Sequence, residues 1–316
     1  MHTDPSFASR FAMPAFVLAS SLVAGNHALG QELVTDRPDQ TESSITVPAG
    51  RWQIETGWTW ARDDQDGERF ETNEGPGTLL RVGVSTRWEL RLGWAGWIRE
   101  EVSGGGQDSV VDGFTDGELG AKVYLREERG AFPEIALLFG TSVPVGENSL
   151  TSDHFDPSFR FSLSHTLSDR LSLGYNLGME WETSDSAGGE HTLSRGIYTV
   201  ALGIGLDNRA GVFVELFGSV AASAEGSPEH SIDGGFTWLL KEDIQLDIAG
   251  GFGLSEAAGD WFLGVGLSVR LPGKGTTSCE QAKTSSAQSS SRSLGMGWTR
   301  RSRIVRGWRC QDTHRR

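Results

Sequence analysis

The feature that most constrains the fold is a period-two alternation of apolar and polar residues, which begins at Arg51 and recurs in short segments. Successive side chains of a β-strand point to opposite faces, so each segment predicts a strand with one apolar and one polar face. A tilted strand of about 9 to 11 residues is long enough to cross a bilayer. About twelve segments show the pattern: 52–60, 80–84, 88–94, 119–125, 135–143, 159–163, 171–181, 198–206, 212–220, 232–240, 244–254 and 261–271.

The links between these segments distinguish a membrane barrel from a soluble β-sandwich, because bacterial barrels have short periplasmic turns and long outer loops. Short links at 85–87, 126–132, 167–170, 207–211 and 241–243 alternate with long polar links at 61–77, 98–114, 144–156, 182–194 and 221–229. Only 255–260 is short for the second class. The chain is therefore predicted to be an all-β protein, a transmembrane antiparallel β-barrel of about twelve strands.

The tryptophans provide a second test, because membrane barrels carry aromatic girdles at both interfaces. If the first strand runs outward, one group falls near the outer rim: Trp60, Trp94, Trp97, Trp181 and Trp261. A second group falls near the inner rim: Trp52, Trp88 and Trp238. Taken singly, each could be a core tryptophan of a soluble β-sandwich. Their clustering at strand ends favours the barrel.

The two ends of the chain differ from this body. Arg10 precedes an apolar run from Phe11 to Ala24 that is too short for a spanning helix, which predicts a signal peptide at 1–30. Residues 31–49 are then a periplasmic leader or a plug segment, and 50–272 are the barrel. Residues 273–316 lose the alternation and become rich in Ser and Arg, which predicts a disordered basic tail.

Charge is divided unevenly between tail and body. The tail holds 10 of the 28 Lys and Arg residues and 2 of the 42 Asp and Glu residues, so the body is strongly acidic. An acidic body repels polyanions, so we expect no nucleic-acid partner. Both cysteines, Cys279 and Cys310, fall in the tail. The expected partners are outer-membrane lipid and lipopolysaccharide, the machinery that assembles outer-membrane barrels, and an unknown small solute.

The segment TDRPDQTES at Thr35–Ser43, with the VPAG that follows at Val47–Gly50, resembles the opening motif of the family described as "putative MetA-pathway of phenol degradation". Weaker likeness continues through PEIALLFGTSVPVG, FVELFG and GVGLSVRLP, at 133–146, 213–218 and 264–272. The resemblance implies an exported outer-membrane barrel of the transporter kind. It brings no catalytic residue with it. One departure is that the last strand ends at Leu271 and Pro272 rather than at the usual terminal aromatic.

Residues that alternate with the apolar faces are expected to line the lumen. The candidates for a solute-contacting set are Arg81, Arg91, Glu118, Lys122, Glu134, Arg160, Asp233 and Asp247, with Glu89, Asn176, Glu180 and Gln245 beside them. Mixed charges inside a barrel wall either pair as a structural network or form a selective constriction, and the two are compatible. The charged segment at Thr35–Ser43 folds into the barrel mouth or stays in the periplasm.

The function that this pattern favours is a bacterial outer-membrane channel or transporter-like barrel for small solutes, with aromatic or apolar compounds as candidates. The alternatives are a plugged structural or interaction barrel, a membrane hydrolase and a soluble periplasmic β-sandwich. The hydrolase lacks support, because His165 and Ser168 are three residues apart and point to opposite faces of an extended strand. We therefore expect no enzyme activity, cofactor or metal.

Overall fold

The computed structural model describes residues 33–106, 108–147, 150–186, 189–222 and 227–271. The predicted signal peptide and basic tail lie outside these residues. Within them, no helix is long and apolar enough to cross a membrane. The strands are β1 (Trp52–Gln65), β2 (Glu68–Gly83), β3 (Trp88–Trp94), β4 (Trp97–Gly104), β5 (Ser109–Phe114), β6 (Gly117–Arg126), β7 (Glu134–Val143), β8 (Pro157–Thr166), β9 (Leu171–Ser186), β10 (Gly189–Gly205), β11 (Ala210–Ala221), β12 (Glu229–Lys241), β13 (Ile244–Gly253) and β14 (Trp261–Leu271).

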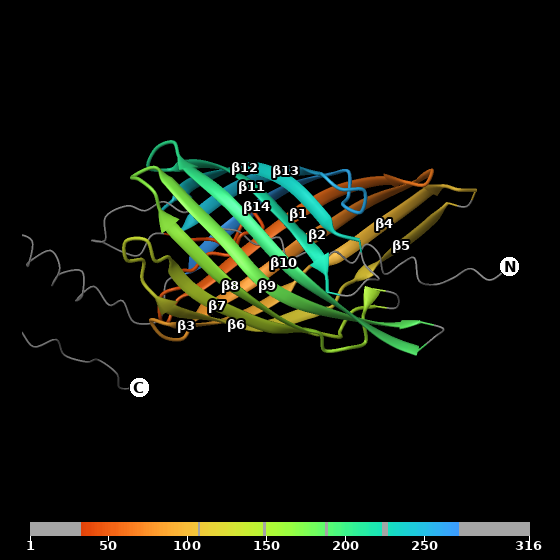
Figure 1. Ribbon diagram of the computed structural model, residues 1–316, viewed down its shortest axis with the longest axis horizontal. Helices are drawn as coiled ribbons and strands as arrows, with labels where there is room; N and C mark the ends of the chain where they lie inside the picture. Colours follow the sequence, from red (N-terminus) through yellow and green to blue (C-terminus); the bar gives the residue numbers. More distant parts are fainter. Residues whose placement is uncertain (1–32, 107, 148–149, 187–188, 223–226, 272–316) are drawn as a thin grey trace, which may run out of the picture. The chain divides into compact units, whose positions relative to one another are not determined.

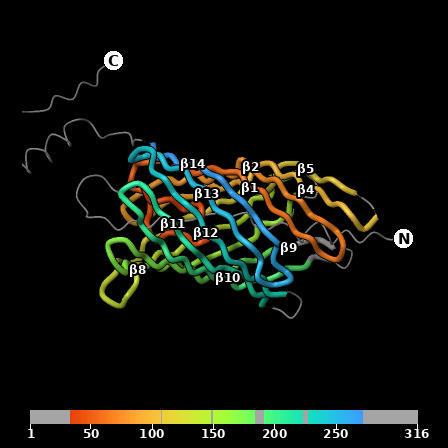
Figure 2. The backbone as a smooth tube through the Cα atoms, turned by 90° about the horizontal axis from the view of Figure 1, so that it is seen from above, coloured from red at the N-terminus to blue at the C-terminus, as the bar shows by residue number. Residues whose placement is uncertain are grey.

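These strands form one antiparallel sheet that closes on itself, because β1 pairs with both β2 and β14 (Figures 1 and 2). Two wall strands are interrupted. β3 and β4 pair with successive parts of β2 and are separated by Ala95 and Gly96, and β5 and β6 are separated by Thr115 and Asp116. Counting each interrupted strand once, the 14 elements make a wall of twelve strands, which confirms the predicted fold.

The barrel reverses the usual distribution of polarity between inside and outside. On β3, Leu90 and Leu92 are 52% and 53% exposed, whereas Glu89 and Arg91 between them are buried at 0% and 6%. Leucines belong on the outer face of such a wall because that face meets lipid rather than water. The exposed tryptophans Trp52, Trp88 and Trp238 lie on strands that meet at the short turns. This closed wall with an apolar exterior places the protein in the bacterial outer membrane.

Three of the long links that the sequence predicts as loops are instead β-hairpins, so the prediction is wrong for these three. Link 61–77 is a hairpin in which β1 and β2 continue to a two-residue turn at Asp66 and Gly67, both with positive φ (53° and 84°). An Asp-Gly pair of this kind is the preferred type I′ hairpin turn. Links 98–114 and 182–194 likewise contain the β4–β5 and β9–β10 hairpins. These hairpins extend the strands at the end opposite the short turns (Figure 1).

The wall ladder is interrupted beside the β4–β5 hairpin. β6 pairs with β3 and β7, whereas β5 pairs, among the described residues, only with β4. β2 pairs with β3 along one part of its length and with β4 along the other. This change of partner requires Gly96 (φ 98°), because a Cβ there would lie 2.8 Å from the Pro76 carbonyl oxygen. At the end of this unpaired edge of β5, the backbone N–H of Glu147 donates a hydrogen bond to Phe114 O, at 2.8 Å.

Candidate functional site

Residues 33–48, called the plug below, lie inside the barrel rather than in the periplasm. Plug residues Thr35, Asp36 and Ser44 are 0% exposed. Hydrogen bonds join the plug to β1, β2, β3, β6, β7, β8, β9, β10, β11, β13 and β14. The plug therefore fills the lumen near the ends of the strands that meet at the short turns.

The plug is a small loop closed at its neck by Asp36. Both the backbone N–H and the hydroxyl of Ser43 donate to Asp36 Oδ1, at 3.0 and 2.7 Å. The residues between them form a tip that reaches the far wall, where Thr41 donates to Glu215 on β11 and Arg37 donates to Asp247 on β13. Asp36 thus fixes the shape of the plug as well as its attachment.

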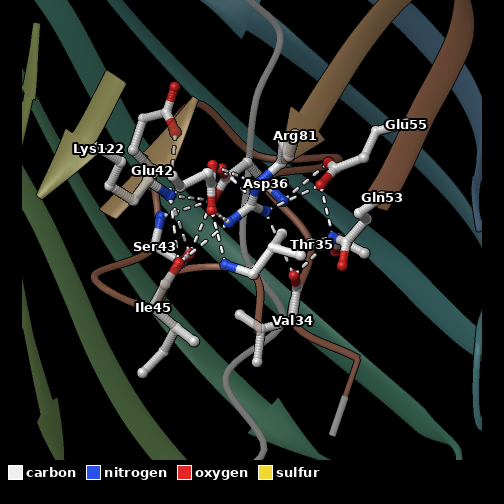
Figure 3. A network of polar contacts seen from close by, with 12 residues as sticks. Val34, Thr35, Asp36, Glu42, Ser43, Ile45, Gln53, Glu55, Arg81 and Lys122 are labelled. Atoms are coloured by element: carbon white, nitrogen blue, oxygen red, sulfur yellow. Dashed lines mark hydrogen bonds and ion pairs between the residues drawn. The ribbon is translucent and has the colours of Figure 1, made fainter. Parts of the chain in front are cut away.

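Three wall cations converge on Asp36, and two of them, Arg81 and Lys122, are labelled in Figure 3. Arg81 Nη1 lies 2.9 Å and Arg91 Nη1 2.5 Å from Asp36 Oδ2. Lys122 Nζ donates to both carboxylate oxygens, at 2.9 and 2.8 Å. The sheet register brings these cations together, because Arg81 faces Arg91 across β2 and β3 while Lys122 faces Glu89 across β3 and β6.

Other carboxylates complete this cluster. From the wall, Glu55 and Glu89 accept from Arg81 at 2.9 and 2.8 Å. From the plug, Glu42 accepts two hydrogen bonds from Arg91 Nη2, both at 3.0 Å. Burying charges is costly unless each is paired and hydrogen-bonded, and this network satisfies that condition. We call Asp36, Glu42, Glu55, Glu89, Arg81, Arg91 and Lys122 the paired cluster.

The opposite side of the plug is different. Asp39 is 2% exposed and has Glu215 of β11 and Asp233 of β12 as acidic neighbours, and the last two are register partners. Among the described residues, Asp39 Oδ1 and both Asp233 side-chain oxygens lack a hydrogen-bond donor. We call Asp39, Glu215 and Asp233 the acidic cluster.

The plug does not itself cross the membrane, and its two aspartates respond to burial in opposite ways. Burial disfavours the Asp36 carboxylate, but Arg81, Lys122 and Arg91 outweigh it and hold the pKa of Asp36 well below its usual range. At Asp39, burial and the neighbouring acids act together and raise the pKa well above the usual range. In the described part of the chain, no group of three His, Cys, Asp or Glu residues is arranged to hold a metal ion.

The remaining candidates lie at two levels of the lumen. Glu134 contacts the plug through the Ser44 hydroxyl at 2.6 Å, and Asp247 pairs with Arg37 at 3.2 Å. Glu118 and Arg160 lie further from the plug, and Arg160 pairs with Glu180 at 3.8 Å. All eight candidates therefore lie on the inner face, but only some of them touch the plug. Their contact with a solute stays a prediction.

Exposure of the inner ion pairs changes along the barrel. Side chains of the Asp36 ion pairs are 0–7% exposed. Those of Arg160 and Glu180 are both 17% exposed, and those of Arg195 and Glu229 are 21% and 30% exposed. The lumen is therefore open to water on the side of the long hairpins and closed by the plug on the side of the short turns. We call the open part, lined by these four residues and Glu118, the vestibule.

Sequence reasoning did not include several residues of the site. Glu55 and Gln53 alternate with the apolar residues of β1, and Glu215 lies between the exposed Val214 and Leu216 of β11. The same period-two criterion that selected Arg81 would have found them. The position of Asp36 in the lumen had no comparable signal, because its three cation partners lie 45 to 86 residues away in sequence.

Fold and site together define a class: an outer-membrane β-barrel of twelve strands whose lumen holds its own N-terminal segment. The family described as "Putative MetA-pathway of phenol degradation" matches residues 35–271, so the chain belongs to that family. The match begins within the plug and ends at the last residue of β14.

The fold is also that of a solved outer-membrane channel. An outer-membrane channel from Pseudomonas putida F1 is 13% identical, with a TM-score of 0.56 over 72% of this chain and 98% of that one. The NanC porin is 8% identical (TM-score 0.46; 70% and 100% covered). The monoaromatic hydrocarbon channel CymD is 9% identical (TM-score 0.41; 71% and 88% covered). The search of curated proteins returned no matching relative.

Proposed function

We propose that this protein passes small solutes across the outer membrane and that small aromatic or otherwise apolar compounds are its substrates. The observation that carries the proposal is the water-accessible vestibule that ends on the buried plug. A vestibule of this kind admits a molecule from outside and holds it next to the plug. The family's link to phenol degradation supports an aromatic substrate.

Two exits are available to a solute in the vestibule. One leads past the plug, which must then move. The other leads through the wall where β5 has no partner beyond β4 among the described residues, a place lined by the exposed Phe114 and Val145. An apolar solute favours the second exit, because leaving sideways keeps it out of the charged plug.

A second candidate function is a sealed barrel that acts through its surface. It is favoured by the hydrogen bonds that join the plug to nearly the whole circumference of the wall. Such a barrel would carry no solute.

A disulfide that locks the plug tests these alternatives. The hydroxyl oxygens of Thr41 on the plug and Thr199 on β10 lie 2.6 Å apart, so Thr41→Cys with Thr199→Cys is a suitable pair once Cys279 and Cys310 are replaced by Ser. Thr56→Cys with Thr78→Cys, within the wall, is the matched control. Uptake of radiolabelled toluene into proteoliposomes is measured before and after oxidation.

We expect uptake by the wild type above empty liposomes and no change in the oxidised control. Loss of uptake in the oxidised plug pair, restored by reductant, means that the solute passes the plug. Unchanged uptake in that variant means that the solute leaves through the wall. Wild-type uptake no greater than that of empty liposomes contradicts the proposal and favours the sealed barrel.

A further inference from the structure

The Asp36 carboxylate is supplied by the plug, whereas all of the cations around it belong to the wall. Arg81, Arg91 and Lys122 come from three neighbouring wall strands and approach one carboxylate to 2.5–2.9 Å. Three converging cations on a rigid scaffold are an anion site, and a carboxylate fits it because Lys122 contacts both of its oxygens. The wall therefore holds this site independently of which carboxylate fills it.

The charge balance of the wall supports the same conclusion. Without the plug, the wall part of the paired cluster has three cations against two carboxylates, Glu55 and Glu89. The two ion pairs of Lys122 are with Asp36 and Glu42, and both of these belong to the plug. Withdrawal of the plug thus leaves one net positive charge in this part of the wall and an amine without those two partners. Such a charge is costly until another anion arrives.

We propose that Arg81, Arg91 and Lys122 form a binding site for the carboxylate of a small organic acid, and that Asp36 occupies this site in the closed barrel as a competitor carried by the chain. The inference deepens the proposed function, on which it rests, by naming a substrate class: monocarboxylates, including aromatic ones. Binding of the acid replaces Asp36 and frees the neck of the plug.

One cation of the vestibule, Arg160, lies on the approach to this site, where it pairs with Glu180. Arg160 is 17% exposed and lies on the vestibule side. Arg91 lies deeper, paired with Glu42, and it contacts Asp36 directly. A carboxylate can therefore pass from Arg160 to Arg91 before it reaches Arg81 and Lys122. Because Asp36 also closes the plug loop through Ser43, its replacement loosens the tip as well as the attachment.

The test compares benzoate with benzyl alcohol, which has a similar size and ring but no charge. Each is added to the vestibule side of single channels in planar bilayers. We expect benzoate to raise the open probability of the wild type several-fold and benzyl alcohol to leave it unchanged. In Lys122→Met the response to benzoate should be lost. Asp39→Asn, a matched change on the other side of the plug that leaves the three cations in place, should keep the response.

Direct binding provides a second measurement, which does not depend on conductance. Asp36→Asn removes the competing charge, so calorimetry should give an apparent Kd for benzoate about tenfold lower than that of the wild type, as expected when a competing state is removed. Heat-modifiable mobility on gels verifies that each variant is a folded barrel. If Lys122→Met does not fold, Lys122→Gln replaces it in the test of the benzoate response.

Equal responses to benzoate and benzyl alcohol, or a benzoate response that survives the loss of the Lys122 charge, overturn the inference. Equal benzoate affinity of Asp36→Asn and wild type does so as well. If toluene uptake persists while benzoate has no effect, the proposed function stands and only the carboxylate site is lost. If wild-type uptake of toluene is no greater than that of empty liposomes, the proposed function itself fails.

Discussion

The two sides of the plug differ in how their charges are matched. On the side of β2, β3 and β6, Asp36 is surrounded by cations, and carboxylates of plug and wall complete the pairing. On the side of β11 and β12, Asp39 faces Glu215 and Asp233, and unpaired oxygens remain among the described residues. Coulomb interactions are stronger at low dielectric than in water, so this contrast contributes to the stability of the closed plug. Ion pairs hold the plug on the first side. On the second side it is held by hydrogen bonds to Glu215, beside Asp39 and Asp233, whose neighbours are acids.

This asymmetry favours a hinge motion in which the plug turns about its Asp36 side. If the plug moves, its Asp39 side should leave the wall first, because the acids there lack the three cations that hold Asp36. The Asp36 side should hold until a competing anion or a mutation disturbs it. The following predictions test this difference.

The largest effect is expected at Arg81, which is 0% exposed and pairs with Asp36, Glu55 and Glu89. Arg81→Met leaves buried carboxylates without their cation, and loss of one partner of a buried pair costs about 3–5 kcal/mol. Urea unfolding in detergent micelles, followed by tryptophan fluorescence, measures the change in free energy of unfolding. A loss below about 1 kcal/mol, the range of exposed pairs, would mean that the paired cluster does not anchor the plug.

Asn substitutions at the two aspartates should act in opposite directions. Asp36→Asn removes the anion that three cations share, so the free energy of unfolding should fall and the open probability should rise. Asp39→Asn removes a like charge, so it should stabilise the barrel by about 1 kcal/mol and lower the open probability. The same measurements apply to both variants. If both variants changed the free energy of unfolding in the same direction, the two sides of the plug would not differ as the account states.

Acidification from pH 8 to pH 5 should strengthen plug closure. The pKa of Asp39 is raised in the folded protein, so its contribution to stability is full below the usual carboxyl range and is lost as pH rises through the raised value. The pKa of Asp36 is lowered, so its contribution is full above the usual carboxyl range and is lost only at lower pH. Bilayer conductance should therefore fall toward pH 5, and Asp39→Asn should flatten the profile. An unchanged slope in that variant would assign the effect to another group.

The smallest effect is expected in the vestibule. Arg195 and Glu229 pair at 2.9 Å but are 21% and 30% exposed, so water screens them. Arg195→Gln should cost less than about 1 kcal/mol. The control is Arg81→Met in the same detergent. Comparable losses at the two positions would mean that the vestibule is not open to water.

Much of this molecule could be predicted from its sequence. The period-two pattern placed Leu90 and Leu92 outside and Glu89 and Arg91 inside, and the count of twelve wall strands is confirmed. The hairpin at Asp66 and Gly67 was missed because its strands extend beyond the membrane, where alternation of polarity is no longer required. Its Asp-Gly turn signal was nevertheless present.

The contrast across the plug could not be predicted in this way. It depends on which wall residues face a segment that has no periodicity of its own, and contacts between residues such as Arg37 and Asp247, 210 positions apart, have no local signal. Register between strands placed Glu215 opposite Asp233, but only the path of the plug brings Asp39 to them. Wall geometry follows from local pattern, whereas the occupancy of the lumen follows from tertiary contacts.

The central claim, that the plug lies in the lumen and closes it, is tested most directly by a cross-link in native outer membranes. Ser44 and Ser164 have hydroxyl oxygens 2.8 Å apart, on the plug and on β8. Ser44→Cys with Ser164→Cys, in a chain whose Cys279 and Cys310 are Ser, should form a disulfide on oxidation and give channels that stay closed until reduced. Absence of the cross-link, with Ser44→Cys fully labelled by an impermeant thiol reagent in folded barrels, would contradict the account.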